Sequence, residues 1–378
     1  MRKKIQISQP VTGQEEWKAL LEPLETGWLT SGPKVREFEQ RFAEIHGVKH
    51  AIACTSATTA LHLALASLDL GAGDEVIVPA YTWVSTANVV LYCGANPVFV
   101  DVDPSTFNMD PGQLKDKINE RTKAIIPVHL FGLCANMDAI AEIAGSIPLV
   151  EDAACAAGAQ YNGKYAGDLG TLGCFSFHPR KSVTTGEGGM VTTNDDALAE
   201  KIQMLRNHGA SISEEQRHHG PQPYLLPEFN VMGFNYRMTD LQGAVGTVQI
   251  QKLEGFISER KEWADFYTRE LAELDWLQTP IVPEGSVHGW QSYVCLVDES
   301  KAPKSRNEIM NILESQGIST RPGTHAVHML AYYRDRYGIA ETDYPCALKA
   351  NNYSMAIPLH NRMSPEDFAY VVQMLKAL

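Results

Sequence analysis

The chain has 378 residues, of which 44% are hydrophobic and 8% are aromatic. This is enough apolar material for one large core and a smaller one, which excludes a disordered chain and a miniature disulfide scaffold. The 45 acidic residues outnumber the 32 basic ones, and the resulting net charge of −13 repels a phosphate backbone. We therefore expect no nucleic acid partner.

The cysteines and the apolar stretches set two further expectations. Seven cysteines, with no CxxC pair and no Cys/His cluster at zinc spacing, predict reduced thiols and no structural metal. The stretch 51–70 is interrupted by Thr, Ser, His and Asp residues, and the basic start at 1–4 leads into a mixed sequence instead of an apolar run. We expect a cytoplasmic protein without a membrane partner.

Short runs rich in β-branched residues alternate with apolar-periodic segments from about residue 35 to residue 195. The predicted strands lie at 50–53, 75–78, 97–100, 123–128, 148–150 and 190–193, and the predicted helices include 58–68 and 137–144. Strands that alternate with helices predict βαβ crossovers. The expected fold is therefore α/β, with a mostly parallel sheet that helices cover on both faces.

The second half of the chain is organised differently. The segment 213–230 carries two adjacent histidines and three prolines, which predicts a long irregular loop of the kind that is often functional. A helical stretch at 239–274 follows and leads to a smaller α/β unit. We expect a large domain at 1–250 and a small C-terminal domain at 251–378.

Ligands bind beyond the carboxyl ends of the strands in such sheets, so the polar residues that follow each strand are the first to consider. Ser56, Ala57 and Thr58 open a helix directly after a strand. The free N–H groups and the positive dipole end of a helix suit a phosphate, although plain N-capping explains this segment equally well by itself. Ser176 brings a second hydroxyl after a later strand.

Lys181 follows an apolar run and precedes a glycine-rich turn into the next strand. An isolated lysine is usually a solvated surface residue. This one is expected near the sheet, and a desolvated lysine is a nucleophile that forms an imine with an aldehyde. The position predicts covalent attachment of a cofactor.

Two further residues stand at strand ends. Asp152 closes the strand at 148–150 and is suited to hold a pyridinium nitrogen in its protonated form, while the alternative is a turn or helix-cap aspartate. Trp83 is suited to lie flat on a cofactor ring, and the alternative is a residue that fills the core. Neither residue by itself establishes a cofactor site.

Two nucleotide-binding patterns are excluded. The segment 158–164 fits the spacing GxxxxGK, but Tyr165 follows it instead of the Ser or Thr that would hold magnesium, and no strand and helix flank it. We interpret it as a hairpin turn. No GxGxxG pattern stands between a strand and a helix, so a nicotinamide-binding site lacks its sequence signature.

The chain resembles the DegT/DnrJ/EryC1/StrS family of sugar aminotransferases from about residue 9 to residue 375. No single motif is specific, and the resemblance rests on their number and order. The motifs are TGWLTSGP at 26–33, GDEVI at 73–77, IIPVH at 125–129, EDAA at 151–154, FSFHPRK at 175–181, TGEGG at 185–189 and GFNYRMT at 233–239.

The resemblance implies a fold type I transferase that uses pyridoxal 5′-phosphate (PLP), with pyridoxamine phosphate as the intermediate form. It implies a large domain with a mostly parallel seven-stranded sheet between helices, and a smaller C-terminal α/β domain. Lys181 matches the lysine that binds the cofactor, Asp152 the partner of the ring nitrogen, and Trp83 the residue stacked on the ring. The residues that match the phosphate-binding positions are Ser56, Ala57, Thr58 and Ser176.

The resemblance also implies a homodimer with its active sites at the subunit interface. Asn235 matches a residue that reaches the phosphate in the neighbouring subunit, with Arg237 as the alternative. Cys155 departs from the family pattern, because relatives often carry His, Gln or Glu after EDAA, and a thiol is a weak hydrogen-bonding group.

The implied reaction moves an amino group from L-glutamate to a nucleotide-linked keto-sugar, most closely a 4-keto-6-deoxy sugar as in perosamine-synthase-like members. The alternatives are a 3-keto-sugar or cyclitol acceptor, a sugar dehydratase, which the presence of Lys181 disfavours, and a non-catalytic ligand-binding relative. Each histidine among the expected substrate contacts is equally well explained as a packed or solvated side chain. The expected contacts are Trp28, Thr30, Ser31, Glu187, His325 and His328.

Overall fold

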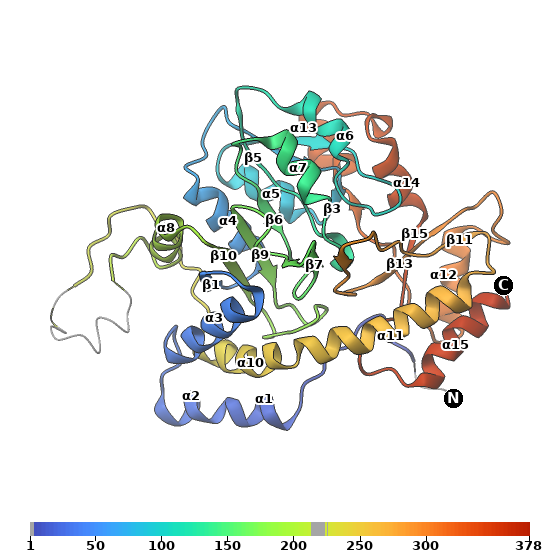
Figure 1. Cartoon of the computed structure of the whole chain (residues 1–378), viewed down its shortest axis with the longest axis horizontal. Helices are drawn as coiled ribbons and strands as arrows, with labels where there is room; N and C mark the ends of the chain where they lie inside the picture. The colour runs from blue at the N-terminus through green and yellow to red at the C-terminus, as the bar shows by residue number, and fades with distance from the viewer. Residues whose placement is uncertain (1–3, 213–223, 225) are drawn as a thin grey trace.

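The computed structural model describes residues 4–212, 224 and 226–378 (Figure 1). Most of the predicted loop at 213–230 therefore lies outside the described residues. The strands are β1 (His50–Cys54), β2 (Glu75–Pro79), β3 (Tyr81–Thr82), β4 (Asn96–Val100), β5 (Thr122–Ile125), β6 (Val150–Asp152), β7 (Gln160–Tyr161), β8 (Lys164–Tyr165), β9 (Leu172–Ser176), β10 (Gly189–Thr193), β11 (Leu277–Gln278), β12 (Ser286–Val287), β13 (Tyr293–Val297), β14 (His325–Ala326) and β15 (Ser354–Ile357).

Two predicted helices are found in the structure: the predicted helix 58–68 is α4, and the predicted helix 137–144 is α7. The helices are α1 (Gln14–Ala19), α2 (Leu21–Thr26), α3 (Pro33–His46), α4 (Ala57–Ser67), α5 (Ser85–Tyr92), α6 (Pro111–Leu114), α7 (Met137–Ala144), α8 (Asp196–Arg206), α10 (Asp240–Gln251), α11 (Leu253–Leu271), α12 (Arg306–Ser315), α13 (Ala331–Tyr337), α14 (Pro345–Tyr353) and α15 (Pro365–Lys376). The predicted helical stretch 239–274 is thus two helices, α10 and α11, separated at Lys252.

The central sheet confirms the expected mostly parallel arrangement of seven strands. The strands β4, β2 and β5 are parallel neighbours, β6 is parallel to β9, and β10 runs antiparallel between β9 and β1. Parallel bridges from Ile125 to Leu149 and from Val128 to Asp152 join the two groups. The strand order is therefore β4-β2-β5-β6-β9-β10-β1.

Two predicted strands have different bounds. The run 123–128 keeps regular pairing only to Ile125, and the run 148–150 begins regular pairing only at Val150. Pro127 and Pro148 explain this, because proline has no N–H group to donate to a sheet ladder. The chain stays extended through both prolines, as the two bridges show.

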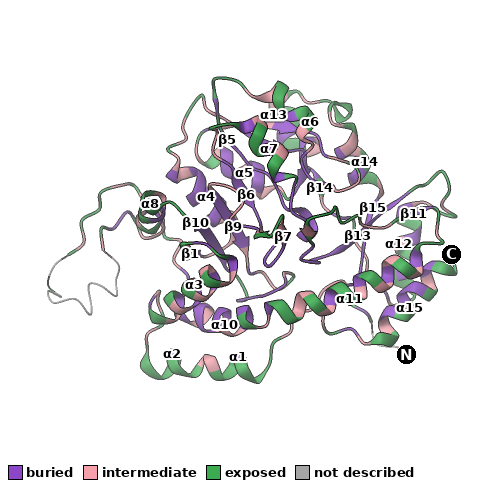
Figure 2. Ribbon diagram, in the orientation of Figure 1, coloured by how far each residue is buried: buried purple, intermediate pink, exposed green. Residues whose placement is uncertain are grey.

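Alternate residues of β2 point to opposite faces of the sheet and enter different clusters. Val76 and Val78 belong to the core beneath α4, α5 and α8, whereas Ile77 packs with residues of α7. Figure 2 shows the buried sheet with helices on its outside. The sheet is thus covered on both faces, which leaves its carboxyl edge as the place for a ligand.

A second core lies in the C-terminal part of the chain. The sheet β11-β13-β15 packs with α11 and α15, where Trp263 and Phe368 stack with ring centroids 4.1 Å apart. The strand β14 pairs antiparallel with β3, so this part of the chain also contacts the segment that follows β2 of the central sheet. The domain boundary at residue 250 stays a prediction.

The remaining expectations concern short features. The GxxxxGK segment forms the antiparallel hairpin β7–β8 around Asn162 and Gly163, as predicted. Within the part of the chain that the structure describes, no helix is both long and apolar enough to span a bilayer.

Candidate active site

A cavity of about 530 Å³ lies at the carboxyl edge of the central sheet. Its walls come from the start of α4 and from the segments that follow β3, β6 and β9, with the segment 321–325 on another side. The structure brings nine of the predicted residues together in this cavity. They are Ser56, Ala57, Thr58, Trp83, Asp152, Ser176, Lys181, Glu187 and His325.

The first turn of α4 forms one end of the cavity. Ser56 caps this helix, because its hydroxyl accepts a hydrogen bond from the N–H of Thr59 at 3.1 Å. The next N–H group, of Ala60, donates to the carbonyl of Ser56 at 2.9 Å. The N–H groups of Ala57 and Thr58 have no partner within the helix. N-capping and anion binding are therefore compatible, and this turn is suited to a phosphate.

The glycine at position 189 lets the β10 strand approach this turn closely. A Cβ atom on Gly189 would lie 2.2 Å from the carbonyl oxygen of Ser56 and 2.8 Å from the nitrogen of Ala57. Both atoms are backbone atoms, which cannot move without shifting α4.

We predict that Gly189→Ala lowers the free energy of unfolding by about 1–3 kcal/mol because of this overlap, measured by urea denaturation. Gly255→Ala is the matched control. That position lies in α11 with nothing within 4 Å of an added Cβ, so alanine should stabilise the protein by about 0.5–1 kcal/mol. Equal effects of the two variants would contradict this interpretation.

Asp152 is a buried carboxylate at the end of β6. One oxygen accepts a hydrogen bond from the Thr86 hydroxyl at 2.7 Å, and the other accepts from the N–H of Ala154 at 3.2 Å. Thr86 is held in turn by Thr82, with 3.0 Å between their hydroxyl oxygens. Burial raises the pKa of Asp152 above its ordinary value, although these hydrogen bonds and the charge of Lys181 oppose the shift. A cation in the cavity would stabilise this carboxylate.

Lys181 lies in a tight turn after β9. Its backbone N–H donates to the carbonyl of His178 at 2.8 Å, and its Nζ atom lies 3.1 Å from the Sγ atom of Cys155. The position where a thiol replaces the longer side chains of relatives is thus in contact with the predicted reactive amine. Cys155 lines the cavity as well.

Trp83, which follows β3 directly, and His325, on β14, both line the cavity. Their rings are 5.6 Å apart at an angle of 48°, because β14 pairs with β3. Trp83 is 55% exposed, so it does not fill the core and leaves a ring surface available for stacking.

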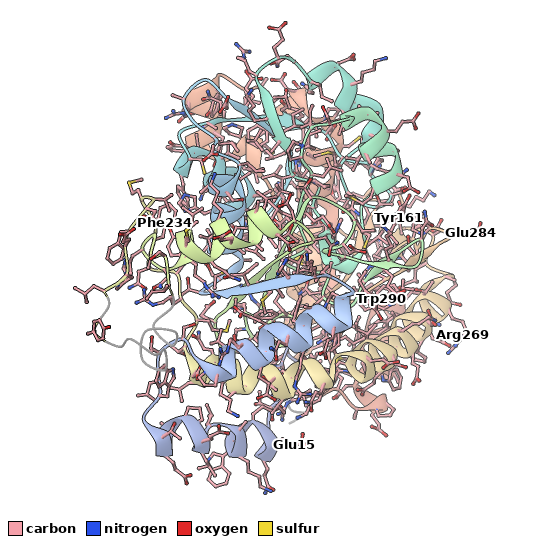
Figure 3. All side chains as sticks on the ribbon, turned by 60° about the vertical axis from the view of Figure 1, so that its left-hand side comes forward. Glu15, Tyr161, Phe234, Arg269, Glu284 and Trp290 are labelled. Atoms are coloured by element: carbon pink, nitrogen blue, oxygen red, sulfur yellow. The ribbon has the colours of Figure 1, made fainter. Side chains whose placement is uncertain are left out.

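Five predicted residues do not line this cavity. Ser31 lines a separate cavity of about 240 Å³ together with Arg206, Asn207 and Arg237. Asn235 is exposed, and its neighbour Phe234 (labelled in Figure 3) stacks with Tyr236, with 5.1 Å between the ring centroids. Trp28 and Thr30, which precede Ser31 in the same loop, do not line the cavity either.

His328 is the fifth predicted residue that does not line the cavity. Its side chain is fully buried in the short 3-10 helix η3 (Val327–Met329), and its Nε2 atom lies 3.2 Å from the carbonyl of Glu341. Burial lowers the pKa of this imidazole. The histidines were predicted as a pair, but η3 follows β14 directly and turns the second one into the core.

The loop that carries Trp28 and Ser31 is held by Asp240. Its carboxylate accepts hydrogen bonds from the N–H groups of Gly32 at 2.8 Å, Val35 at 3.1 Å and Lys34 at 3.2 Å. An aspartate of α10 therefore caps α3, more than 200 residues away in sequence.

Asp240→Ala is expected to lower the free energy of unfolding by about 1–3 kcal/mol, because it leaves these N–H groups of a buried helix start without their acceptor. Asp116→Ala, at an exposed position, serves as the control and should change it by less than about 0.5 kcal/mol. Guanidinium denaturation measures the free energy of unfolding of both variants. An unchanged midpoint for Asp240→Ala would contradict the role of this cap.

Sequence reasoning assigned no role to several polar residues of the cavity, among them Arg180, Gln291 and Arg321. Arg180 stands beside Lys181, and its carbonyl accepts a hydrogen bond from Gln291 at 2.9 Å. Arg321 precedes the histidines that were considered. The sequence signal for the two arginines was their position near Lys181 and His325, whereas Gln291 has no predicted residue beside it.

These residues fit PLP. The first turn of α4 and Ser176 suit its phosphate, the buried Asp152 suits its ring nitrogen, and the amine of Lys181 suits its aldehyde. The burial of Asp152 is the observation that supports this fit: this residue is 5% exposed, the Thr86 and Ala154 groups that donate hydrogen bonds to its carboxylate are neutral, and a protonated pyridine would supply a cation for it. Among the described residues, no three or more His, Cys, Asp or Glu side chains are grouped as a metal site.

Comparisons with known proteins agree with this geometry. GDP-perosamine synthase of Caulobacter vibrioides is 39% identical over 98% of this chain and 97% of its own length. The spore coat polysaccharide biosynthesis protein SpsC of Bacillus subtilis is 39% identical over 98% of this chain and 95% of its own length.

Solved structures give the same result. The sugar aminotransferase Spr1654 of Streptococcus pneumoniae, described as putative and solved in PLP and PMP forms, is 29% identical with TM-scores of 0.90 and 0.91. The alignments cover 99% of this chain and 98% of that one. The DegT/DnrJ/EryC1/StrS aminotransferase family matches residues 10–376. On these grounds the chain belongs to the DegT/DnrJ/EryC1/StrS aminotransferase family.

Proposed function

We propose that this enzyme transfers the amino group of L-glutamate to a nucleotide-linked keto-sugar, and that the acceptor is a 4-keto-6-deoxy sugar. The aminotransferase class and the PLP cofactor follow from the family. The single observation that carries the proposal is the cavity in which Lys181, Asp152 and the start of α4 meet. The acceptor is supported by the 39% identity to a GDP-perosamine synthase.

The chemistry divides between the cofactor and this chain. When bound, PLP supplies an aldehyde for the incoming amine and a ring that withdraws electrons from the reacting carbon. The Nζ atom of Lys181 removes the proton from the α-carbon of glutamate, and in the second half-reaction it delivers a proton to the sugar carbon that receives the amine. Lys181 therefore acts as both tether and proton carrier.

Asp152 and the start of α4 fix the geometry for these proton transfers. Thr86 and Ala154 hold the carboxylate of Asp152 in place, where it would pair with the protonated ring nitrogen of the cofactor. The Ala57 and Thr58 N–H groups would bind its phosphate. Holding the cofactor at these two places would restrict where the reacting carbon can lie relative to Lys181.

The same proposal includes a homodimer. Asn235, Ser31 and Trp28 lie away from the cavity of their own chain, which is expected for residues that reach the site of a neighbouring subunit. Exposed apolar residues that precede Asn235 in the sequence support this, among them Leu226 at 80%, Phe229 at 64% and Met232 at 86% exposed. Sedimentation velocity of the purified protein tests it, and a monomer at working concentration would contradict it.

The function is tested by product mass. The purified protein with PLP is incubated with ¹⁵N-labelled L-glutamate and one acceptor in each reaction. The acceptors are nucleotide-linked 4-keto-6-deoxy sugars, 3-keto sugars and cyclitol ketones. We expect a labelled amino sugar from a 4-keto acceptor only. A labelled product from another acceptor would replace the proposed sugar, and loss of a hydroxyl without label would show a dehydratase.

A further inference from the structure

A buried arginine is hydrogen-bonded to the turn that carries Lys181. Arg260, on α11, is 4% exposed. Its Nη1 atom donates to the hydroxyl of Ser182 at 3.1 Å and to the carbonyl of Trp290 at 3.4 Å, and its Nε atom donates to the side-chain oxygen of Asn361 at 2.8 Å. Ser182 follows Lys181 in the chain, so this guanidinium is attached to the turn one residue from the reactive amine.

The three groups that accept hydrogen bonds from Arg260 are all neutral. Burial lowers the pKa of this guanidinium to about 10, and the charge of Glu259, to which Asn361 donates at 2.7 Å, opposes the shift. Arg260 therefore remains charged at neutral pH, although an apolar side chain of similar size would avoid the desolvation of a cation. What an apolar side chain could not do is donate to three acceptors in different directions.

The residue before Lys181 is held by the same segment that Arg260 contacts. The carbonyl of Arg180 accepts a hydrogen bond from the side chain of Gln291, and Gln291 follows Trp290 in the chain. Trp290 (labelled in Figure 3) has a φ of 45°, a strained value for a bulky residue that persists only where the surroundings fix it. Both residues that flank the lysine are thus tied to residues 290–291 and to α11.

The helix that carries this arginine packs against two cores. Leu253, at the start of α11, belongs to the cluster that contains Phe177, whereas Tyr267 belongs to the C-terminal core. Figure 1 shows α11 extending from α10 to the C-terminal part of the molecule. The turn of Lys181 is therefore anchored to a long helix that is itself fixed on both sides of the anchor point.

We infer that Arg260 is a positioning residue for Lys181, and that it acts through the hydroxyl of Ser182. The lysine amine has to move between its bond to the cofactor and the two carbons at which it transfers protons, so the backbone that carries it must stay in place. Arg260 does not line the cavity, which separates this role from contact with a substrate. The inference rests on the proposed function, since it concerns the steps that Lys181 performs.

The test compares Ser182→Ala, Arg260→Lys and the double variant with the parent protein. Ser67→Ala is the matched control, because Ser67 is also buried and its hydroxyl donates to the carbonyl of Ala64 within α4. Stopped-flow absorbance measures how fast PLP, added to the cofactor-free protein, forms the visible band of the lysine-bound cofactor. The same instrument measures the rate and the apparent affinity with which L-glutamate bleaches that band, and thermal unfolding of the cofactor-free protein measures stability.

We expect Ser182→Ala to slow band formation and bleaching by about threefold to tenfold, as for the loss of one hydrogen bond, with the apparent glutamate affinity unchanged. Arg260→Lys should slow both steps at least as much, because a single amine cannot replace the planar donor group. The double variant should be no slower than Arg260→Lys, since both substitutions remove the same contact. Ser67→Ala should match the parent protein in all measurements.

A purely structural role of Arg260 predicts a different pattern. Arg260→Lys would then lower the melting temperature, while Ser182→Ala would keep both rates of the parent protein. That result overturns the inference while glutamate transamination stands, and Ser182→Ala gives it even if Arg260→Lys fails to fold. Effects of the two substitutions that multiply in the double variant would also overturn it. If Ser182→Ala slows band formation but the parent protein transfers no amine from glutamate, the positioning role stands and the proposed donor fails.

Discussion

Replacing Lys181 with alanine is expected to lower amine transfer by at least about 10³-fold, the upper part of the range for a positioned acid–base group. The reason is that, among the described residues, Lys181 is the only lysine that lines the cavity, with its Nζ atom beside Cys155. The fold should persist, because the side chain makes one hydrogen bond, to a thiol. Steady-state kinetics and a thermal unfolding curve measure the two parts of this prediction.

Lys164→Ala is the control for this result. Lys164 belongs to the β7–β8 hairpin that fits the GxxxxGK spacing, and it should be dispensable. Appreciable turnover by purified Lys181→Ala would contradict the role of the lysine. A loss of activity in Lys164→Ala as large as that in Lys181→Ala would instead point back to the phosphate-loop interpretation that we excluded.

Asp152→Asn is expected to lower kcat/KM by about 10²–10³-fold, as for removal of a charge placed to stabilise the transition state. The same substitution should raise the melting temperature of the cofactor-free protein. The reason is that burial raises the pKa of Asp152 in the folded state, so the folded protein binds its proton more tightly than the unfolded chain does. Stability therefore falls as pH rises from the ordinary pKa of 3.8 through the raised one.

At neutral pH the wild-type carboxylate is thus a destabilising charge that the cofactor offsets, and asparagine removes that charge. We expect PLP to raise the melting temperature of the wild type more than that of Asp152→Asn. Asp116→Asn, at an exposed position, should change neither value. An equal effect of PLP on the wild type and Asp152→Asn would show that this carboxylate does not face the cofactor.

The central sheet could be predicted because its signals are local. Val76, Ile77 and Val78 alternate between two cores, and this pattern is visible in the sequence alone. The cavity residues Asp152 and Ser56 were also predictable, since Asp152 ends one strand, Ser56 follows another by two residues, and ligands bind at that edge of parallel sheets. The two proline-containing strands were misjudged at their ends, because propensity does not show which N–H groups a ladder requires.

Long-range contacts explain what the sequence could not show. Arg321 reaches the cavity because β14 pairs with β3 and because the Tyr81 hydroxyl holds the adjoining backbone, contacts that join residues more than 240 positions apart. The same segment buries His328 three residues after the cavity-facing His325. The cap that Asp240 provides for α3 has no sequence signal, since the two elements are distant along the chain.

The absorption spectrum of the purified protein tests the central claim most directly. Added PLP should produce the visible band of a lysine-bound cofactor, absent in Lys181→Ala. Excess L-glutamate should bleach that band, and a nucleotide-linked 4-keto-6-deoxy sugar should restore it, which would establish both half-reactions at one lysine. A wild-type protein that forms no such band with PLP would contradict the assignment of Lys181 and with it the catalytic account.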